Sequence, residues 1–164
     1  MRLIVVRHAI AGVRDPRIWL NDGERPLTKK GRIRFARAAE GLARLVPEVD
    51  LMLSSPYVRA WDTAMLLKEH GGWPAPQICD ELKDGSPEVV LQALQPYRSL
   101  DSVAMVGHEP YLSRFISQVL SPAAGVTMEL KKGAAACIDL PQTETHTDSR
   151  LLWLLQPRAL RGLA

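Results

Sequence analysis

Three short apolar runs, each followed by polar residues, set the pattern of this chain. Leu3–Val6 predicts a buried strand over residues 2–7, and similar runs predict strands at 51–54 and 102–106. Two further strands are expected near 134–140 and 150–156. Continuous apolar runs are typical of strands that are covered on both faces of a sheet.

Helices are predicted between these strands, over about 29–45, 57–70, 87–94 and 110–120. Thr28 is the expected N-cap of the first helix, and Ile33 is among its apolar residues at helical spacing. Strands that alternate with helices predict an α/β fold with three layers, α/β/α, in which a mostly parallel sheet has helices on both faces. The chain has no linker, repeat or low-complexity tract, so residues 1–164 are expected to form a single domain.

Composition excludes several functional classes. The net charge is only +3, and the sequence contains no helix-turn-helix or RNA-binding motif, so no nucleic-acid partner is expected. Several arginines do share the first predicted helix or the tail: Arg32, Arg34, Arg37 and Arg44, then Arg158 and Arg161. A solvated helix face is the favoured interpretation of the first group.

Cysteine usage and hydropathy point to an ordinary intracellular protein. Cys79 and Cys137 are far apart and lack metal-ligand spacing, so neither a disulfide framework nor a zinc site is expected. No segment has the length of apolar sequence needed to span a bilayer. We therefore expect a cytoplasmic protein that binds no membrane.

Charged residues follow the three strands at the points where each strand ends. Arg7 and His8 end the first strand, Arg59 follows the second, and His108 follows the third. Open α/β sheets bind ligands at the carboxyl ends of their strands. Two guanidinium forks can hold a phosphoryl group, and a histidine can attack its phosphorus without a metal ion. The pattern therefore predicts a phosphoryl-transfer site.

Four segments, in order along the chain, carry a family resemblance. Arg7-His8-Ala9 resembles an Arg-His-Gly signature, residues 25–31 (RPLTKKG) an RPLTxxG segment, residues 55–64 (SPYVRAWDTA) an SPxxRAxxTA segment, and residues 106–110 (VGHEP) a VGHxP segment. On these residues the chain resembles the histidine phosphatase superfamily, the phosphoglycerate mutase-like enzymes. Within that superfamily it is most similar to the compact SixA-type phosphohistidine phosphatases.

The resemblance implies a role for each matched residue. His8 would be the nucleophile that becomes phosphorylated, while Arg7 and Arg59 would bind the phosphoryl oxygens. His108 would stabilise the transition state and help to bind the phosphate, either protonated or with one N–H. Arg25 would either contact the substrate or form a structural salt bridge.

Two further positions bear on the chemistry. Asp84 occupies the place of the acid that protonates the leaving group in larger members of the family, with Glu81 as a rival, and either could be a solvated loop acid. Ala9 replaces the signature glycine and would narrow the approach to His8 if that position required a positive φ. His70 and His146 are interpreted as surface residues.

The segment between Asp84 and the strand at 102–106 is too short for a large lid insertion. An open site suits a phosphate displayed on another protein, so the expected substrate is phosphohistidine on a protein and the product inorganic phosphate. The alternative is a phosphatase of small phosphomonoesters. A mutase, which needs an enclosed site, and a non-catalytic phosphate-binding module are less favoured. No cofactor and no metal are expected.

Overall fold

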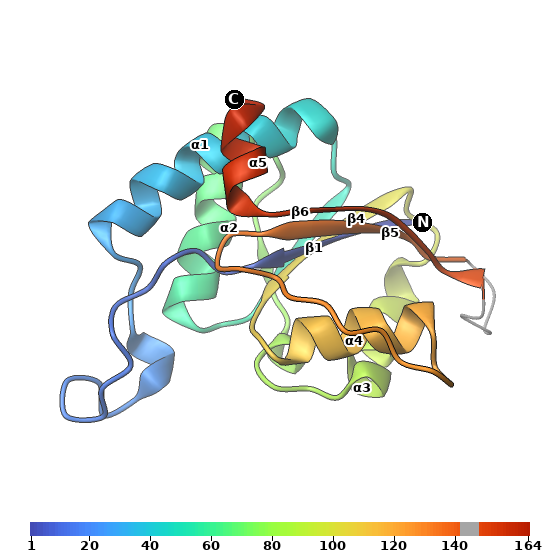
Figure 1. Ribbon diagram of the computed structural model, residues 1–164, viewed down its shortest axis with the longest axis horizontal. Coiled ribbons are helices and arrows are strands. Elements are labelled where there is room, and N and C mark those ends of the chain that lie inside the picture. Colours follow the sequence, from blue (N-terminus) through green and yellow to red (C-terminus); the bar gives the residue numbers. More distant parts are fainter. Residues whose placement is uncertain (142–147) are drawn as a thin grey trace.

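The computed structural model describes residues 1–141 and 148–164 (Figure 1). The strands are β1 Arg2–Arg7, β2 Leu51–Ser54, β3 Gln77–Ile78, β4 Ser102–Gly107, β5 Ala135–Asp139 and β6 Arg150–Leu155. The α-helices are α1 Lys29–Leu45, α2 Val58–Gly71, α3 Pro87–Leu94, α4 Tyr111–Leu120 and α5 Pro157–Gly162. Three 3₁₀ turns complete the described elements: η1 Asp22–Glu24, η2 Asp80–Leu82 and η3 Gln95–Tyr97.

The strands form one six-stranded sheet in the order β3-β2-β4-β1-β5-β6. β3, β2, β4 and β1 run parallel to one another, whereas β5 is antiparallel to both β1 and β6. The predicted, mostly parallel sheet is therefore confirmed, with β5 as the reversed strand.

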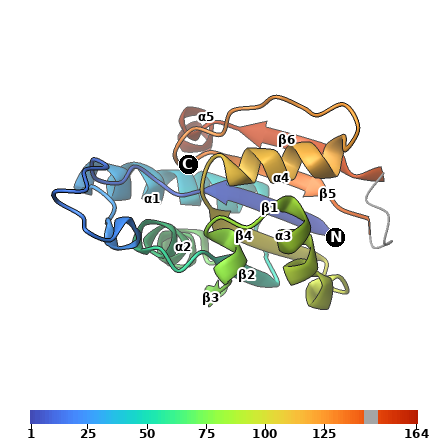
Figure 2. The same ribbon diagram turned by 90° about the horizontal axis from the view of Figure 1, so that it is seen from below.

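Side chains that alternate along each strand explain why the apolar runs are continuous. In β1, Ile4 and Val6 pack into one core with α1, α2 and α5, while Leu3 and Val5 pack into the other with α3 and α4. Figure 1 shows these two sets of helices on opposite sides of the strands, and Figure 2 shows α3 and α4 lying across the sheet on the same face. The three-layer α/β/α architecture is confirmed, and the segment 85–101 contains only α3 and η3 where a lid insertion would lie.

Local sequence signals set the helix ends as predicted. Thr28 caps α1, because its Oγ1 accepts a hydrogen bond of 2.9 Å from the Gly31 N–H. Ser86 caps α3 in the same way, with Pro87 in the first turn. Within the described residues, no helix is long and apolar enough to cross a membrane.

Two expectations about the helices were wrong or incomplete. The buried face of α1 holds Phe35, Ala38 and Leu42, whereas Ile33 is 59% exposed. The apolar periodicity of α1 was ambiguous because alanines line both sides of the helix. The α5 helix was not anticipated at all, since six residues are too few to show a period.

Candidate active site

Parallel pairing brings the carboxyl ends of the three predicted strands to the same end of the sheet. Arg7 pairs with Gly107, and the His8 N–H donates a hydrogen bond of 3.0 Å to the Gly107 carbonyl, so His8 and His108 leave adjacent strands side by side. The chain then runs outward from β1, as the blue segment in Figure 1 shows.

A cavity of about 670 Å³ lies at these carboxyl ends, and we call it the strand-end cavity. Its lining includes every residue that the sequence assigned to the site: Arg7, His8, Arg25, Arg59, Asp84 and His108. His8, Arg25, Arg59 and His108 are buried, although their side chains are polar or charged. Polar side chains are seldom buried to this extent unless they have partners or a function.

The His8 ring has a defined tautomer. Its Nδ1 lies 2.7 Å from the Ala9 carbonyl oxygen, which can only accept, so Nδ1 carries the proton and Nε2 keeps its lone pair. Burial lowers the pKa of the His8 imidazole to about 3, despite the opposing effect of the Ala9 carbonyl, and the Arg59 and Arg7 cations lower it further. The ring is therefore neutral at pH 7.

His108 lies against His8, with the two ring centroids 5.1 Å apart. Its Nε2 is 2.9 Å from the Ser55 Oγ. Burial, with the neighbouring His8 and Arg59, lowers the pKa of His108 to about 2. His108 is thus neutral at pH 7, and of the two expected forms, protonated or with a single N–H, the second applies.

Two arginines of the cavity, Arg25 and Arg59, share the carboxylate of Asp22. Arg25 Nε lies 2.9 Å from Asp22 Oδ1, and Arg59 Nη2 lies 3.0 Å from Asp22 Oδ2. Arg59 Nη1 also donates to the Asp22 carbonyl, at 2.7 Å. The hydrogen bond from Arg25 lowers the pKa of Asp22 below its usual range, and the Arg59 charge adds to this effect. Arg25 therefore forms a salt bridge, one of its two predicted roles, and it also lines the cavity.

Buried polar atoms without partners gather at this cavity. Among the described residues, such atoms include Arg7 Nε, Arg59 Nε, His108 Nδ1 and Glu109 Oε1, which all belong to lining residues. The Arg7 side chain donates a hydrogen bond from Nη1 to the Leu130 carbonyl, at 2.6 Å. Glu109 Oε1 is an acceptor, but the other three atoms are arginine or histidine nitrogens that can donate. Because unpaired buried donors are rare and costly, these nitrogens indicate a site prepared for a hydrogen-bond acceptor.

Ala9 does not narrow the cavity. No residue other than glycine has a positive φ in the part of the chain that the structure describes, so Ala9 is unstrained. Its N–H donates to Thr63 Oγ1 at 3.0 Å, and Thr63 Oγ1 in turn donates to the Arg59 carbonyl. Ala9 is not among the residues lining the strand-end cavity. The condition for an obstruction, a positive φ at residue 9, is therefore not met, and the alanine methyl packs into the apolar core.

The two candidate acids lie in different surroundings. Asp84 lines the strand-end cavity, whereas Glu81 is outside the lining and accepts a hydrogen bond of 3.3 Å from the Cys79 Sγ. Of the pair, Asp84 is the one placed to act on a bound group. Within residues 1–141 and 148–164, no group of three His, Cys, Asp or Glu side chains is arranged to hold a metal ion.

Other lining residues were not predicted. Tyr57 packs 5.1 Å from the His108 ring, and the Arg59 guanidinium lies 4.8 Å above the Tyr57 ring. Asp22 and Lys132 reach the cavity from the loop before α1 and the loop before β5. Tyr57 lay inside a recognised segment, but nothing in the sequence distinguished Asp22 or Lys132 from other loop charges.

Among the described residues, His70 is the histidine that takes no part in the cavity. His70 is exposed at the end of α2, and its Nδ1 lies 3.8 Å from a Glu40 oxygen. This agrees with its interpretation as a surface residue. His146 lies outside the described residues.

Comparison with known families identifies the chain. Residues 3–88 match the family model of the histidine phosphatase superfamily (branch 1), which is more than half of the sequence. The chain belongs to the histidine phosphatase superfamily. An uncharacterized protein of Picosynechococcus sp. is 32% identical over 98% of this chain and 99% of its own length. Membership of the superfamily makes this chain a phosphatase.

Solved structures of this superfamily share the fold. The protein histidine phosphatase SixA, in complex with tungstate, matches with a TM-score of 0.84 at 22% identity, covering 98% of this chain and 99% of that one. The putative phosphohistidine phosphatase SixA from Agrobacterium tumefaciens matches with a TM-score of 0.77 at 22% identity, over 95% and 97% of the two chains. This histidine phosphatase therefore has a SixA-like fold.

Proposed function

We propose that this phosphatase removes the phosphoryl group from phosphohistidine on a protein, through a covalent intermediate on His8 and without a metal ion. The observation that carries the proposal is the fixed tautomer of His8. Since Nδ1 donates to the Ala9 carbonyl, Nε2 has a free lone pair in a cavity with unpaired arginine and histidine nitrogens. A neutral imidazole, kept neutral by burial, is the reactive form of this nucleophile.

The two steps follow from this arrangement. His8 Nε2 attacks phosphorus in line, the P–N bond of the substrate breaks, and the leaving imidazole takes up a proton. Water then attacks the phosphorus, the bond to Nε2 breaks, and inorganic phosphate is released. Arg7, Arg59 and a His108 N–H would neutralise the charge that spreads over the phosphoryl oxygens in both transition states.

Ser55 supports His108 in this role. The Ser55 Oγ already accepts from the Tyr57 N–H at 3.4 Å and can donate its own proton to His108 Nε2. That hydrogen bond places the His108 proton on Nδ1, the buried ring nitrogen without a protein partner. Ser55 would thus be a positioning residue that aims one N–H at the phosphoryl group.

The shape of the cavity supports a substrate displayed on another protein. The segment 85–101 forms no lid, and the cavity of about 670 Å³ is far larger than one phosphoryl group. The position of Asp84 favours a second candidate function, the hydrolysis of small phosphomonoesters. An alkoxide leaving group depends more strongly than imidazole on protonation by a general acid.

The nucleophile is tested by turnover of a chromogenic phosphoester after treatment of the protein with EDTA. His8→Ala should lower kcat by a factor on the order of a thousand or more, because no other group can form the intermediate. His70→Ala is the matched control and should keep full activity. Undiminished turnover by His8→Ala would reject the nucleophile, and no turnover by the unaltered protein would favour a phosphate-binding module.

The substrate class is tested with Asp84→Asn. We expect this change to lower kcat/KM about a hundredfold for sugar phosphates and to leave dephosphorylation of a phosphohistidine-bearing protein within about threefold. The unaltered protein should also show the higher kcat/KM for the phosphohistidine protein. A higher value for sugar phosphates would overturn the proposed substrate while leaving the His8 chemistry intact.

A further inference from the structure

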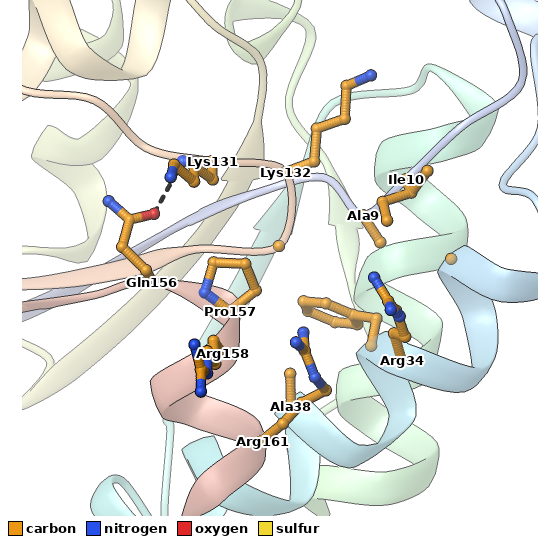
Figure 3. A pocket seen from close by; sticks show the side chains of 13 residues that line it. Ala9, Ile10, Arg34, Ala38, Lys131, Lys132, Gln156, Pro157, Arg158 and Arg161 are labelled. Carbon is orange, nitrogen blue, oxygen red and sulfur yellow. Dashed lines mark hydrogen bonds between the residues drawn. The ribbon is translucent and has the colours of Figure 1, made fainter.

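A second cavity, of about 330 Å³, lies on the other side of the segment that follows β1 (Figure 3). We call it the α1–α5 cavity, because α1, α5 and the loop before β5 form its walls. Phe35, Ala38 and Pro157 contribute apolar surface to it. Ala9 and Ile10 separate it from the strand-end cavity, and nothing in the proposed reaction uses it.

The polar lining of this cavity is strongly cationic. Arg34 comes from α1, Arg158 and Arg161 come from α5, and Lys131 and Lys132 come from the loop before β5. Figure 3 shows the side chains of Arg34, Arg158 and Arg161 around the same hollow. None of the lining residues is an aspartate or a glutamate.

Several surface arginines of the protein have a carboxylate partner among the described residues, unlike Arg34 and Arg158. Arg17, Arg32 and Arg150 each form an ion pair with a carboxylate. Within the described chain, Arg34 and Arg158 form none. A solvated helix face explains Arg32, but it does not explain why two elements far apart in sequence place unpaired arginines against each other.

The like charges of this cluster act on Arg161, its most buried member. Burial lowers the pKa of Arg161, and the neighbouring charges of Arg34, Arg37 and Arg158 lower it further. Like charges held this close destabilise a fold unless an anion compensates them. The arrangement therefore has the electrostatics of an anion site.

We propose that the α1–α5 cavity binds a small organic anion that carries two or more phosphoryl groups. Guanidinium forks match phosphate oxygens bidentately, which favours phosphoryl groups over other anions. One phosphoryl group carries at most two negative charges and would leave most of the five cations uncompensated. The apolar surface from Phe35 and Pro157 suits the carbon body of such a ligand, and the concave shape suits a small molecule better than a protein surface.

The test uses methylenediphosphonate, a diphosphonate that a phosphatase cannot hydrolyse, in titration calorimetry. Arg34→Gln/Arg158→Gln should weaken one binding event about tenfold or more, because two charge-assisted contacts are lost. Both side chains are exposed and unpaired among the described residues, so the double variant should fold normally. Arg114→Gln, an exposed arginine on α4, is the matched control and should bind like the unaltered protein.

The strand-end cavity also attracts phosphonates, so a second variant separates the two sites. In Arg59→Ala the α1–α5 binding event should persist and should shift the amide resonances of Gly133 and Phe35, which line that cavity. Binding that vanishes in Arg59→Ala would mean that only the strand-end cavity is occupied and would overturn the proposal. Unchanged affinity in Arg34→Gln/Arg158→Gln, or binding only to longer polyanions such as an acidic peptide, would overturn it as well.

Discussion

Two neutral imidazoles beneath a group of arginines are the central feature of this phosphatase at the residue scale. Burial keeps His8 and His108 uncharged, and the arginine field reinforces this effect. An arriving phosphate dianion would oppose both effects, because a nearby negative charge favours the protonated ring. Binding and protonation at this site are therefore coupled, while the protein alone presents the reactive neutral base.

The same burial makes the stability of the fold depend on pH. In the folded protein the pKa is about 3 for His8 and about 2 for His108, whereas an exposed histidine has a pKa of 6.5. Between these values the unfolded chain therefore binds more protons than the folded protein. Stability is therefore lost as pH falls from 6.5 towards 3. At pH 5 the loss is about 2 kcal/mol for each histidine.

Urea unfolding at pH 7 and pH 5 measures this loss. The variant His8→Asn/His108→Asn should lose about 4 kcal/mol less than the unaltered protein between these two values of pH. His70→Asn should behave like the unaltered protein, because His70 is exposed. Equal losses in all three proteins would contradict the buried neutral state.

The sequence was informative about site residues that follow buried strands. His8 and His108 were predictable because an apolar run, a parallel sheet and a shared strand edge together fix their positions. Asp22 and Lys132 were not, since they come from loops whose course depends on packing that no local pattern encodes. Arg34 and Arg158 are separated by more than half of the chain length. No local pattern therefore predicted that they would line the same cavity.

At the scale of elements, a close contact between α1 and α5 organises one side of the molecule. A methyl group on Gly41 would lie 1.9 Å from the Leu160 carbonyl oxygen, so α5 can lie against α1 only because residue 41 has no side chain. Leu160 itself is fully buried in the same core. This contact explains why a six-residue segment without clear apolar periodicity forms a helix. Because the contact depends on tertiary packing, the local sequence did not predict α5.

Gly41→Ala should therefore displace α5 and destabilise the protein. We expect a loss of at least about 2 kcal/mol, or about 4–8 °C in Tm, because the methyl group would overlap a backbone carbonyl. Gly162→Ala is the matched control, since a methyl group there meets no atom within 4 Å. Its Tm should stay within a few degrees of the original or rise. A Gly41→Ala protein with unchanged Tm would contradict the described packing.

At the scale of the whole molecule, the modest net charge of +3 hides an uneven distribution. The strand-end cavity is lined by six cations and three carboxylates, and the α1–α5 cavity adds four more cations besides Lys132, which lines both cavities. Such a surface attracts anionic partners over distances that salt shortens. The positive potential around the two cavities would therefore favour binding of the proposed phosphoprotein substrate where that protein is acidic.

Ionic strength should consequently separate large substrates from small ones. Between about 0.05 M and 0.5 M salt, kcat/KM for an acidic phosphohistidine protein should fall about tenfold, because many of its charges meet the cationic surface. For a chromogenic phosphoester, whose only charge is its phosphoryl group, the fall should be about threefold or less. Stopped-flow or steady-state rates across this range measure both slopes, and equal slopes would count against a protein substrate.

The segment that follows β1 has one further consequence. Its residues form a common wall, with His8 and Ala11 facing one cavity and Ala9 and Ile10 facing the other. If a ligand in one cavity shifts this wall so that affinity in the other cavity changes, linkage requires the effect to be reciprocal. Inorganic phosphate bound at His8 would then change the affinity of the α1–α5 cavity for its ligand. That ligand would change the affinity of the strand-end cavity for phosphate by the same factor. The enzyme would in that case sense its own product.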